Sequence, residues 1–346
     1  MPMIPVFDGH NDTLIAPGAT SIASGREGGH LDLPRMRAGG MRGGIFAIFT
    51  PSRESEGKPR RLERDDGVLE WARAPRVGRP TAAAWVTRVA GRLFALERDG
   101  HVAIARGIGD IDRAFGGQGP PVAVLHFEGA EAIDTGLEAL DFWYAAGLRS
   151  LGPVWSRSNS FGHGVPFIFP SSPDTGPGLT RAGKALVKRC GELGVMVDLS
   201  HLNAAGFWDI ARAEAGPLVA SHAGVHALAP CSRNLTDAQL DAVRDSGGLV
   251  GIVYAAPFLR ADFAEDSDTP IALIARHVRY VADRIGTEHV ALGSDFDGTL
   301  IPAPLGDVAG LPKLLDALRG AGFSEPELEA VAWRNWRRVL SSWWKH

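Results

Sequence analysis

Residues 180–201 read TRAGKALVKRCGELGVMVDLSH, a helical pattern followed directly by a short apolar run. Thr180 is a suitable N-cap for a helix over Thr180–Leu193. The run Val195–Leu199 is apolar on nearly every residue, as strands buried on both faces of a parallel sheet are. Short apolar runs alternate with amphipathic stretches in the same way along the rest of the chain. The alternation predicts βαβ units around a parallel sheet.

Seven further apolar runs complete a set of eight expected strands. The eight are Ile4–Asp8, Gly44–Phe49, Pro121–Phe127, Leu148–Val154, Val195–Leu199, Pro217–Ala220, Gly248–Tyr254 and Val290–Gly293. Further helices are expected over Thr81–Glu97, Thr236–Ser246 and Pro270–Ile285. Eight strands in 346 residues favour a closed (β/α)8 TIM barrel over the alternative, an open doubly wound sheet. We therefore expect residues 1–346 to form a single barrel domain.

Two segments interrupt the alternation. Residues 52–79 are charged and rich in Arg, Pro and Gly, so they predict a surface excursion, which we place around residues 51–106. Pro166–Gly178 contains four prolines and two glycines and is expected to form a structured loop above the sheet.

The composition excludes several classes of protein. The chain carries 36 Lys and Arg against 40 Asp and Glu, a net charge of −4, so nothing predicts a nucleic-acid partner. No apolar run approaches the roughly 20 residues of a membrane helix, and the first residues do not resemble an export signal. We therefore expect a cytoplasmic protein without a membrane partner. Cys190 and Cys231 are expected to be free thiols.

Ionisable side chains follow several predicted strands, always at the carboxyl end. They are His10 and Asp12 after the first strand, Glu128 after the third, His201 after the fifth, His222 after the sixth and Asp295 after the eighth. In a parallel barrel these ends meet at one mouth. Three imidazoles and three carboxylates are donors that zinc accepts, and they suffice for two ions that share a carboxylate. A single histidine or aspartate at a strand end is more often a hydrogen-bonded core group than a metal ligand. An ordered set of such residues at the same end of several strands favours a metal site.

The motifs His-x-Asp, Phe-Glu-Gly, Asp-Leu-Ser-His, Ser-His and Gly-Ser-Asp-Phe-Asp-Gly occur in this order. The order resembles the membrane (renal) dipeptidase family, the zinc-dependent M19 metallopeptidases, over nearly the whole chain. The resemblance implies an amidohydrolase-like barrel and a binuclear zinc-dependent dipeptidase that tolerates a D-residue at the C-terminal position. It implies that the first zinc binds His10 and Asp12, that the second binds His201 and His222, and that Glu128 bridges the two ions.

The resemblance also implies the residues that act beside the metals. Asp295 corresponds to the carboxylate that handles the proton of the metal-bound water. Arg233 corresponds to the arginine that binds the carboxylate of the dipeptide, and its planar fork suits bidentate contact with such a group. Ser200 and Ser221 precede ligand histidines and are expected to orient them, while Asp198 and Asp297 are expected to brace the site.

The chain departs from the family pattern at one position. Family members of the mammalian pattern carry a histidine after the fourth strand, where this chain has Trp155. Trp155 and His163 are therefore candidate substrate-binding residues, and Arg157 is a third candidate for the same place. Each could equally pack or face solvent. His126 is either a group behind the metal ligands or a core histidine.

Other functions remain open. A related metal-dependent hydrolase could act on a cyclic amide, lactone, N-acyl amino acid or phosphoester, and a metal-binding scaffold without turnover is a second alternative. The chain has no Gly-x-Ser-x-Gly elbow and no Gly-x-Gly-x-x-Gly turn after its first strand, so a serine hydrolase and a dinucleotide-binding oxidoreductase are disfavoured. The tryptophan-rich segments Trp333–Leu340 and Trp343–Trp344 predict a helix that packs on the barrel or forms a homodimer contact.

Overall fold

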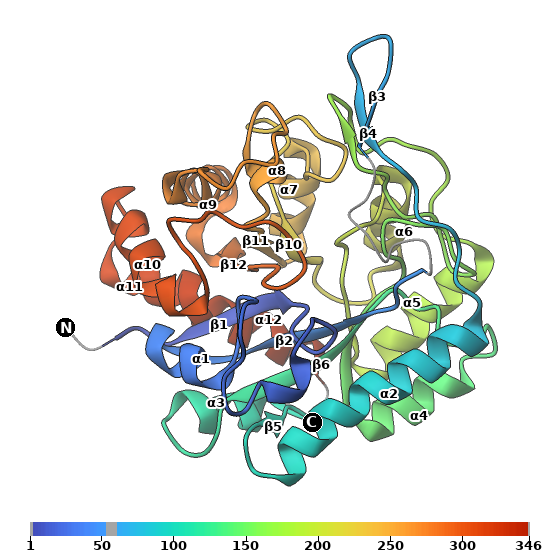
Figure 1. The fold of residues 1–346 in the computed structure, drawn as a ribbon. Helices are drawn as coiled ribbons and strands as arrows, with labels where there is room; N and C mark the ends of the chain where they lie inside the picture. The colour runs from blue at the N-terminus through green and yellow to red at the C-terminus, as the bar shows by residue number, and fades with distance from the viewer. Residues whose placement is uncertain (1–2, 53–60, 345–346) are drawn as a thin grey trace.

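The computed structural model describes residues 3–52 and 61–344, and parallel strands form its centre (Figure 1). The barrel strands are β1 (Val6–Asn11), β2 (Met41–Phe49), β6 (Val122–Glu128), β7 (Leu148–Gly152), β9 (Met196–Val197), β10 (Val219–Ala223), β11 (Leu249–Ile252) and β12 (Val290–Leu292). They pair in the order β1-β2-β6-β7-β9 and β10-β11-β12. Each of the eight predicted strands overlaps one of them.

Two isolated parallel bridges join the two sheets. Asp198 pairs with Val219 between β9 and β10, and Asn11 pairs with Phe296 between β1 and the residues after β12. The sheet therefore closes on itself, which confirms the TIM barrel and shows that the open-sheet alternative was wrong. The short strand β5 (Ala103–Ile104) pairs with the start of β6.

Helices surround the barrel (Figure 1). They are α1 (Leu33–Gly39), α2 (Arg79–Arg98), α3 (Ile108–Phe115), α4 (Glu138–Ala146), α5 (Arg181–Leu193), α6 (Ala204–Ala213), α7 (Asp237–Asp245), α8 (Ala256–Leu259), α9 (Ile271–Ile285), α10 (Leu311–Gly320), α11 (Glu325–Glu329) and α12 (Asn335–Trp343). The predicted cap of α5 is observed, since the Thr180 side chain accepts a hydrogen bond from the Gly183 amide, and Thr236 forms a capping box with Gln239 at the start of α7. No helix of the described residues is long and apolar enough to span a lipid bilayer.

The predicted surface excursion contains strands that the sequence did not reveal. Residues 53–60 lie outside the described part of the chain. Beyond them, β3 (Arg61–Glu63) and β4 (Leu69–Trp71) form an antiparallel hairpin that projects from the barrel (Figure 1). β4 also pairs with β8 (Ile168–Phe169), which lies in the proline-rich loop. These strands have only two or three residues, and β8 pairs with a segment about 100 positions away, so local periodicity could not predict them.

The C-terminal helix packs on the barrel, one of the two places expected for it. Trp336 is fully buried, and its indole N–H donates to the Leu292 carbonyl at 2.9 Å. The ring fills space left by glycine: a Cβ at Gly9 would lie 2.3 Å from its Cζ2 atom. Trp343 donates to the Pro217 carbonyl and Trp344 to the Arg149 carbonyl. The chain end therefore stabilises the barrel that carries the site.

Truncation of this tryptophan tests its packing role. We expect Trp336→Ala to lower the free energy of unfolding by about 3–5 kcal/mol, the usual cost of removing a large aromatic side chain from a core. Urea denaturation followed by circular dichroism measures the change. Phe142→Ala, at a side chain that is 66% exposed on α4, serves as the control and should change stability by no more than about 0.5 kcal/mol. Equal effects of the two substitutions would contradict the packing role.

Candidate metal centre

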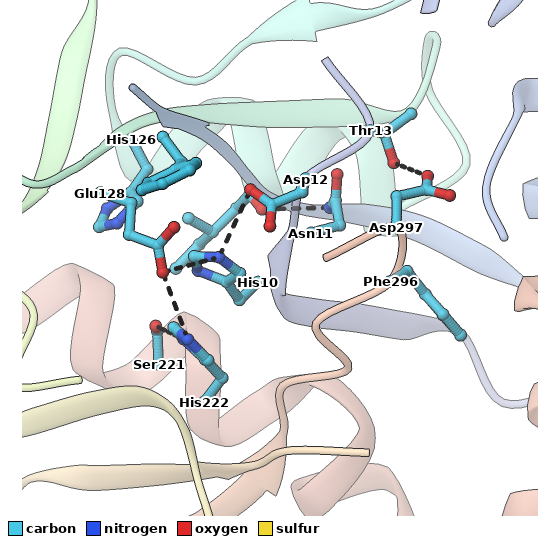
Figure 2. Close-up of polar contacts among 12 residues, drawn as sticks. His10, Asn11, Asp12, Thr13, His126, Glu128, Ser221, His222, Phe296 and Asp297 are labelled. Atoms are coloured by element: carbon cyan, nitrogen blue, oxygen red, sulfur yellow. Dashed lines mark hydrogen bonds and ion pairs between the residues drawn. The ribbon is translucent and has the colours of Figure 1, made fainter. Parts of the chain in front are cut away.

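The candidate metal ligands lie at the carboxyl end of the barrel. His10 is in β1, Glu128 ends β6 and His222 is in β10, while Asp12 and His201 follow their strands by one and four residues. All five are buried, with exposed fractions between 0 and 7%. Figure 2 shows His10, Asp12, Glu128 and His222 converging on one place. The barrel thus brings together side chains that are more than 200 residues apart in sequence.

One carboxylate oxygen lies at the centre of this group. Glu128 Oε1 is 2.9 Å from His201 Nε2, 3.5 Å from His222 Nε2 and 3.6 Å from His10 Nε2. Asp12 Oδ1 is 4.0 Å from His10 Nε2. The donor atoms therefore form two sets suited to a metal ion, His10–Asp12–Glu128 and Glu128–His201–His222, which share Glu128. These are the two sets that the sequence predicts.

A third set of donors includes a residue expected only to brace the site. Asp198 lies within 4.8 Å of the donor atoms of His10 and His222. Its carboxylate also accepts hydrogen bonds from the Ser200 amide at 3.0 Å and from the Ser221 amide and hydroxyl at 2.8 and 2.5 Å. These bonds support the bracing role, because they tie the loop after β9 to β10.

Neighbouring hydroxyls orient two of the imidazoles. Ser156 Oγ is 2.7 Å from His201 Nδ1, and Ser221 Oγ is 2.8 Å from His222 Nδ1. Since Ser221 donates its own proton to Asp198, His222 Nδ1 must donate to Ser221, so the lone pair of this ring lies on Nε2, which is 3.0 Å from His201 Nε2. Both Nε2 atoms thus face Glu128. The sequence predicted the role of Ser221 but not that of Ser156.

Several buried polar atoms of the cluster lack hydrogen-bond partners among the described residues. They are both ring nitrogens of His10 and the Oδ1 atom of Asp12. Buried polar atoms without partners are costly, and nitrogen and carboxylate donors that face one another are the coordination sphere of a divalent cation. The residues present therefore fit a metal site.

The ionisation of the cluster also favours a cation. Burial lowers the pKa of His10, His201 and His222, so these imidazoles are neutral, as metal ligands must be. Burial raises the pKa of Asp12 and Glu128, and so do the neighbouring carboxylates. A divalent cation would offset this concentration of negative charge.

Asp295 lies beside the cluster with a distinct ionisation. Burial raises its pKa to about 7, and the positive charge of Arg233 partly opposes that rise. Its backbone is left-handed, with φ 59°. A Cβ at Gly298 would lie 2.2 Å from Asp12 Oδ2 and 2.3 Å from Asp295 Oδ1. Only glycine at this position therefore leaves room for both carboxylates. A carboxyl group that titrates near neutral pH is suited to proton transfer.

Asp297 braces the loop after β12, as expected from the sequence. It accepts hydrogen bonds from the Thr13 hydroxyl at 2.8 Å and the His30 amide at 2.6 Å, and it pairs with Arg26. Figure 2 shows the Thr13 contact. The loop that carries Asp295 is thereby fixed to the segments that follow β1.

Arg233 is buried near the same carboxylates. It is 4% exposed, and its Nη2 atom donates to the His222 carbonyl at 2.8 Å. Its Nε atom has no hydrogen-bond partner among the described residues. Asp295, Asp198 and Glu128 act on its charge electrostatically. The guanidinium therefore has a free donor close to the cluster.

A cavity of about 480 Å³ opens onto the cluster. Its polar lining includes Asp12, Glu128, His201 and Asp295, and its apolar lining consists of Leu300 and five aromatic side chains: Phe49, Trp71, Trp155, Phe167 and Phe258. Of these aromatics the sequence singled out only Trp155. Trp71 ends β4, Phe258 lies in α8 and Phe167 directly precedes β8, and no motif in the sequence marked them as cavity residues.

The other candidates near Trp155 lie behind this lining. His163 is not among the described residues that line the cavity, and its Nδ1 atom is 3.0 Å from Ser158 Oγ. Arg157 pairs with Glu131 at 2.8 Å and donates to the Thr50 carbonyl. Its guanidinium is thus bound within the protein, so the structure does not favour it as a substrate contact.

His126 lies behind the metal ligands. Its Nδ1 atom is 2.8 Å from the Ser150 hydroxyl and its Nε2 atom is 3.8 Å from Asp198. Burial lowers its pKa to about 4. It is therefore a neutral, buried histidine next to Asp198, consistent with either of the two roles expected for it.

A TIM barrel with buried histidines and carboxylates at its mouth defines a metal-dependent hydrolase, and comparisons with known proteins specify the family. The family model described as membrane dipeptidase, peptidase family M19, matches residues 1–343. An uncharacterised Klebsiella pneumoniae protein encoded in the pqqA 5′ region is 52% identical over 222 residues, which is 64% of this chain and 82% of that protein.

Solved structures agree. A dipeptidase described as an M19 metallopeptidase superposes with a TM-score of 0.91 at 43% identity, covering 99% of each chain. A Rhodobacter sphaeroides metallopeptidase, solved with a phosphinate mimic of the dipeptide L-Ala-D-Ala, also has a TM-score of 0.91, at 42% identity over 99% of this chain and 100% of that one. The chain belongs to the membrane dipeptidase family M19. It is a metal-dependent dipeptidase with an amidohydrolase-like TIM barrel, and the predicted family is confirmed.

The contact between Ser156 and His201 leads to a prediction. We expect Ser156→Ala to weaken metal binding by about 10- to 100-fold, because residues that orient metal ligands contribute that much to affinity. Competition with a chelator measures the change. Ser158→Ala is a matched control in the same loop, since Ser158 contacts His163 rather than a member of the cluster. The orienting role is wrong if both variants bind metal as the wild type does.

Proposed function

We propose that residues 1–346 form one (β/α)8 barrel metallohydrolase domain that is a binuclear zinc dipeptidase, acting on short dipeptides with a free C-terminal carboxylate. The first zinc would bind His10 and Asp12, the second His201 and His222, and Glu128 would bridge them. The observation that carries this proposal is the position of Glu128 Oε1, within 3.6 Å of the Nε2 atoms of three histidines. The choice of zinc rests on the mixed nitrogen and oxygen donors.

The metal ions and the residues around them would each contribute to a different part of the reaction. Two bound zinc ions would supply a nucleophile at neutral pH and polarise the scissile carbonyl. Asp295, whose pKa is about 7, would accept the proton of the attacking water and return it to the leaving amine. Arg233 would hold the carboxylate of the substrate and so fix the position of the scissile bond. The aromatic lining that includes Trp155 would exclude bulk water.

The comparisons support a finer statement about stereochemistry. The similar Rhodobacter sphaeroides enzyme was solved with a mimic of L-Ala-D-Ala. We propose that this chain likewise accepts a D-residue at the C-terminal position. A substrate-binding role for His163, a cytoplasmic location and a homodimer stay predictions.

One experiment tests the proposed function as a whole. The protein is stripped with a chelator, reloaded with zinc, and assayed against L,L and L,D dipeptides and against a cyclic amide, a lactone, an N-acyl amino acid and a phosphoester. We expect two zinc ions per chain and cleavage of the dipeptides alone. Cleavage of another bond class would favour the related-hydrolase alternative, and binding of two ions without any cleavage would favour the inactive scaffold.

A further inference from the structure

The five aromatic side chains that line the cavity form a continuous surface, which we call the aromatic wall: Phe49, Trp71, Trp155, Phe167 and Phe258. Neighbouring rings contact one another, with centroids 4.6 Å apart for Phe49 and Trp155, 5.8 Å for Trp155 and Phe167, and 5.5 Å for Phe167 and Phe258. The wall is thus one apolar face several side chains long.

Part of the wall belongs to a small apolar cluster that is separate from the barrel core. Phe258 is buried in this cluster with Cys231, Val253, Ala255 and Phe263, and Trp71 and Phe167 pack against it. A satellite cluster that faces a cavity adds apolar surface beyond the core of the barrel. Its position next to the metal site suggests a function in binding.

The hairpin β3–β4 brings Trp71 to this cluster. The Trp71 amide donates to the Phe167 carbonyl at 3.0 Å, which continues the pairing of β4 with β8. The Trp71 ring lies 5.0 Å from Phe167, 6.1 Å from Phe258 and 5.7 Å from Phe263. Backbone pairing and ring packing therefore hold Trp71 in place without a ligand, so little ordering is needed when substrate binds.

A buried guanidinium supports the other end of the wall. Arg157 Cζ lies 5.0 Å from the Phe49 ring and 5.6 Å from the Trp155 ring, while its Nε atom donates to Glu131 and its Nη2 atom to the Thr50 carbonyl. Contacts between a cation and aromatic faces are favourable when both are removed from water. The whole wall is therefore preformed.

The wall extends from the metal cluster to the guanidinium of Arg233. Trp155 and Phe167 lie 5.7 and 6.0 Å from the His201 ring, and Phe258 lies 6.0 Å from Arg233 Cζ. A dipeptide with its scissile carbonyl at the cluster and its carboxylate at Arg233 must place its C-terminal residue between these points. The side chain of that residue then lies against the aromatic wall.

The lining of the cavity also includes acidic side chains. They are Asp12, Asp295, Asp297 and Glu265. Asp12 is a proposed metal ligand and Asp297 pairs with Arg26, so Glu265 is the lining carboxylate that would repel an acidic side chain on the substrate. Such a side chain would also gain nothing from the aromatic rings, whereas the ammonium group of the substrate is compatible with an acidic lining.

We propose that the aromatic wall makes this dipeptidase selective for substrates whose C-terminal residue carries a large apolar side chain, an aromatic one above all, and that it disfavours acidic side chains there. The inference rests on the proposed function, because it uses the placement of the substrate between the metal cluster and Arg233. Trp71 is the residue expected to determine this selectivity.

The test compares dipeptides that differ only in the C-terminal residue. L-Ala-Gly, L-Ala-Leu, L-Ala-Phe and L-Ala-Asp are assayed with zinc-loaded enzyme, the last three with the C-terminal residue in both the L and the D form. We expect kcat/KM for Phe to exceed that for Gly by roughly tenfold or more, the lower end of what an apolar pocket provides, and kcat/KM for Asp to be the lowest.

Variants of Trp71 test whether the aromatic wall causes the preference for Phe over Gly. Trp71→Ala should bring the Phe-to-Gly ratio of kcat/KM towards one, and Trp71→Phe should retain most of it. Phe142→Ala, an exposed aromatic on α4, is the control and should keep the wild-type ratio. Both substrates are measured on the same preparation, so a variant that folds only in part does not change the ratio.

The outcomes separate the two proposals. Cleavage of all these dipeptides at similar kcat/KM would overturn the inference and leave the dipeptidase function intact, whereas cleavage of none of them would overturn both. A wild-type Phe-to-Gly ratio in Trp71→Ala would show that the aromatic wall does not cause the selectivity.

Discussion

Replacement of Glu128 by Gln is expected to weaken metal binding by more than roughly 100-fold, since residues that merely orient ligands are worth 10- to 100-fold. The Glu128 carboxylate belongs to both donor sets, so its loss disrupts the binding of both ions rather than one. Hydrolysis of L-Ala-D-Ala should fall with metal content. Chelator competition and elemental analysis of the purified variant measure the change.

The stability of the metal-free protein distinguishes the loss of a metal ligand at position 128 from a loss of folding. Burial raises that pKa in the metal-free protein, so the folded state binds a proton at pH values where the unfolded state has already lost it. Stability contributed by the protonated form is therefore lost as the pH rises above the ordinary pKa of a glutamate. A neutral amide escapes this penalty, so the melting temperature of metal-free Glu128→Gln at pH 8 should not be below that of the metal-free wild type.

Glu131→Gln is the matched control for Glu128→Gln. Glu131 is as buried as Glu128, with exposed fractions of 5 and 4%, and lies three residues further along the chain, but it pairs with Arg157 outside the cluster. It should keep wild-type metal affinity. If Glu128→Gln also retained both ions, Glu128 would not be the shared ligand.

Replacement of Arg233 by Ala is expected to lower kcat/KM for dipeptides by about 10²- to 10⁴-fold. This range corresponds to the loss of two hydrogen bonds to a charged group at about 1.5–3 kcal/mol each. Arg233→Lys should lie between Arg233→Ala and the wild type, because lysine keeps the charge but lacks the planar fork. Steady-state kinetics with L-Ala-D-Ala measure both variants.

An amidated substrate identifies the group that Arg233 binds. The wild type should strongly prefer the free acid to the C-terminal amide, and Arg233→Ala should lose most of that preference. The positive charge of Arg233 also lowers the pKa of Asp295, so its removal can slow both reactions. The acid-to-amide ratio corrects for this shared effect. An unchanged ratio in Arg233→Ala would contradict binding of the substrate carboxylate by this residue.

The barrel could be predicted because each of its strands and helices has its own pattern within a short stretch of sequence. Strands of a closed parallel barrel are buried on both faces, so each reads as an apolar run between amphipathic helices. Caps such as Thr180 also act within a few residues. The antiparallel strands β3, β4 and β8 could not be predicted, because each has only two or three residues and because β8 pairs with β4 from about 100 positions away. The place of Trp71 in the cavity lining depends on that pairing and was missed with it.

The residues of the metal cluster could be identified from their position at strand ends together with their chemistry. The hydroxyl that orients His201 could not, because Ser156 lies in an irregular segment 45 residues away. The raised pKa of Asp295 likewise depends on burial and on nearby charges that only the folded chain assembles. In this protein the sequence identifies the candidate ligands, and the fold determines their orientation and ionisation.

The proposed chemistry requires two metal ions that share Glu128. Anomalous diffraction at the zinc edge, from crystals grown with zinc chloride, tests it directly. We predict two peaks about 3.5–4 Å apart, one against His10 and Asp12, the other against His201 and His222, with Glu128 between them. A single peak, peaks that Glu128 does not contact, or no peak at the barrel mouth would contradict the binuclear centre.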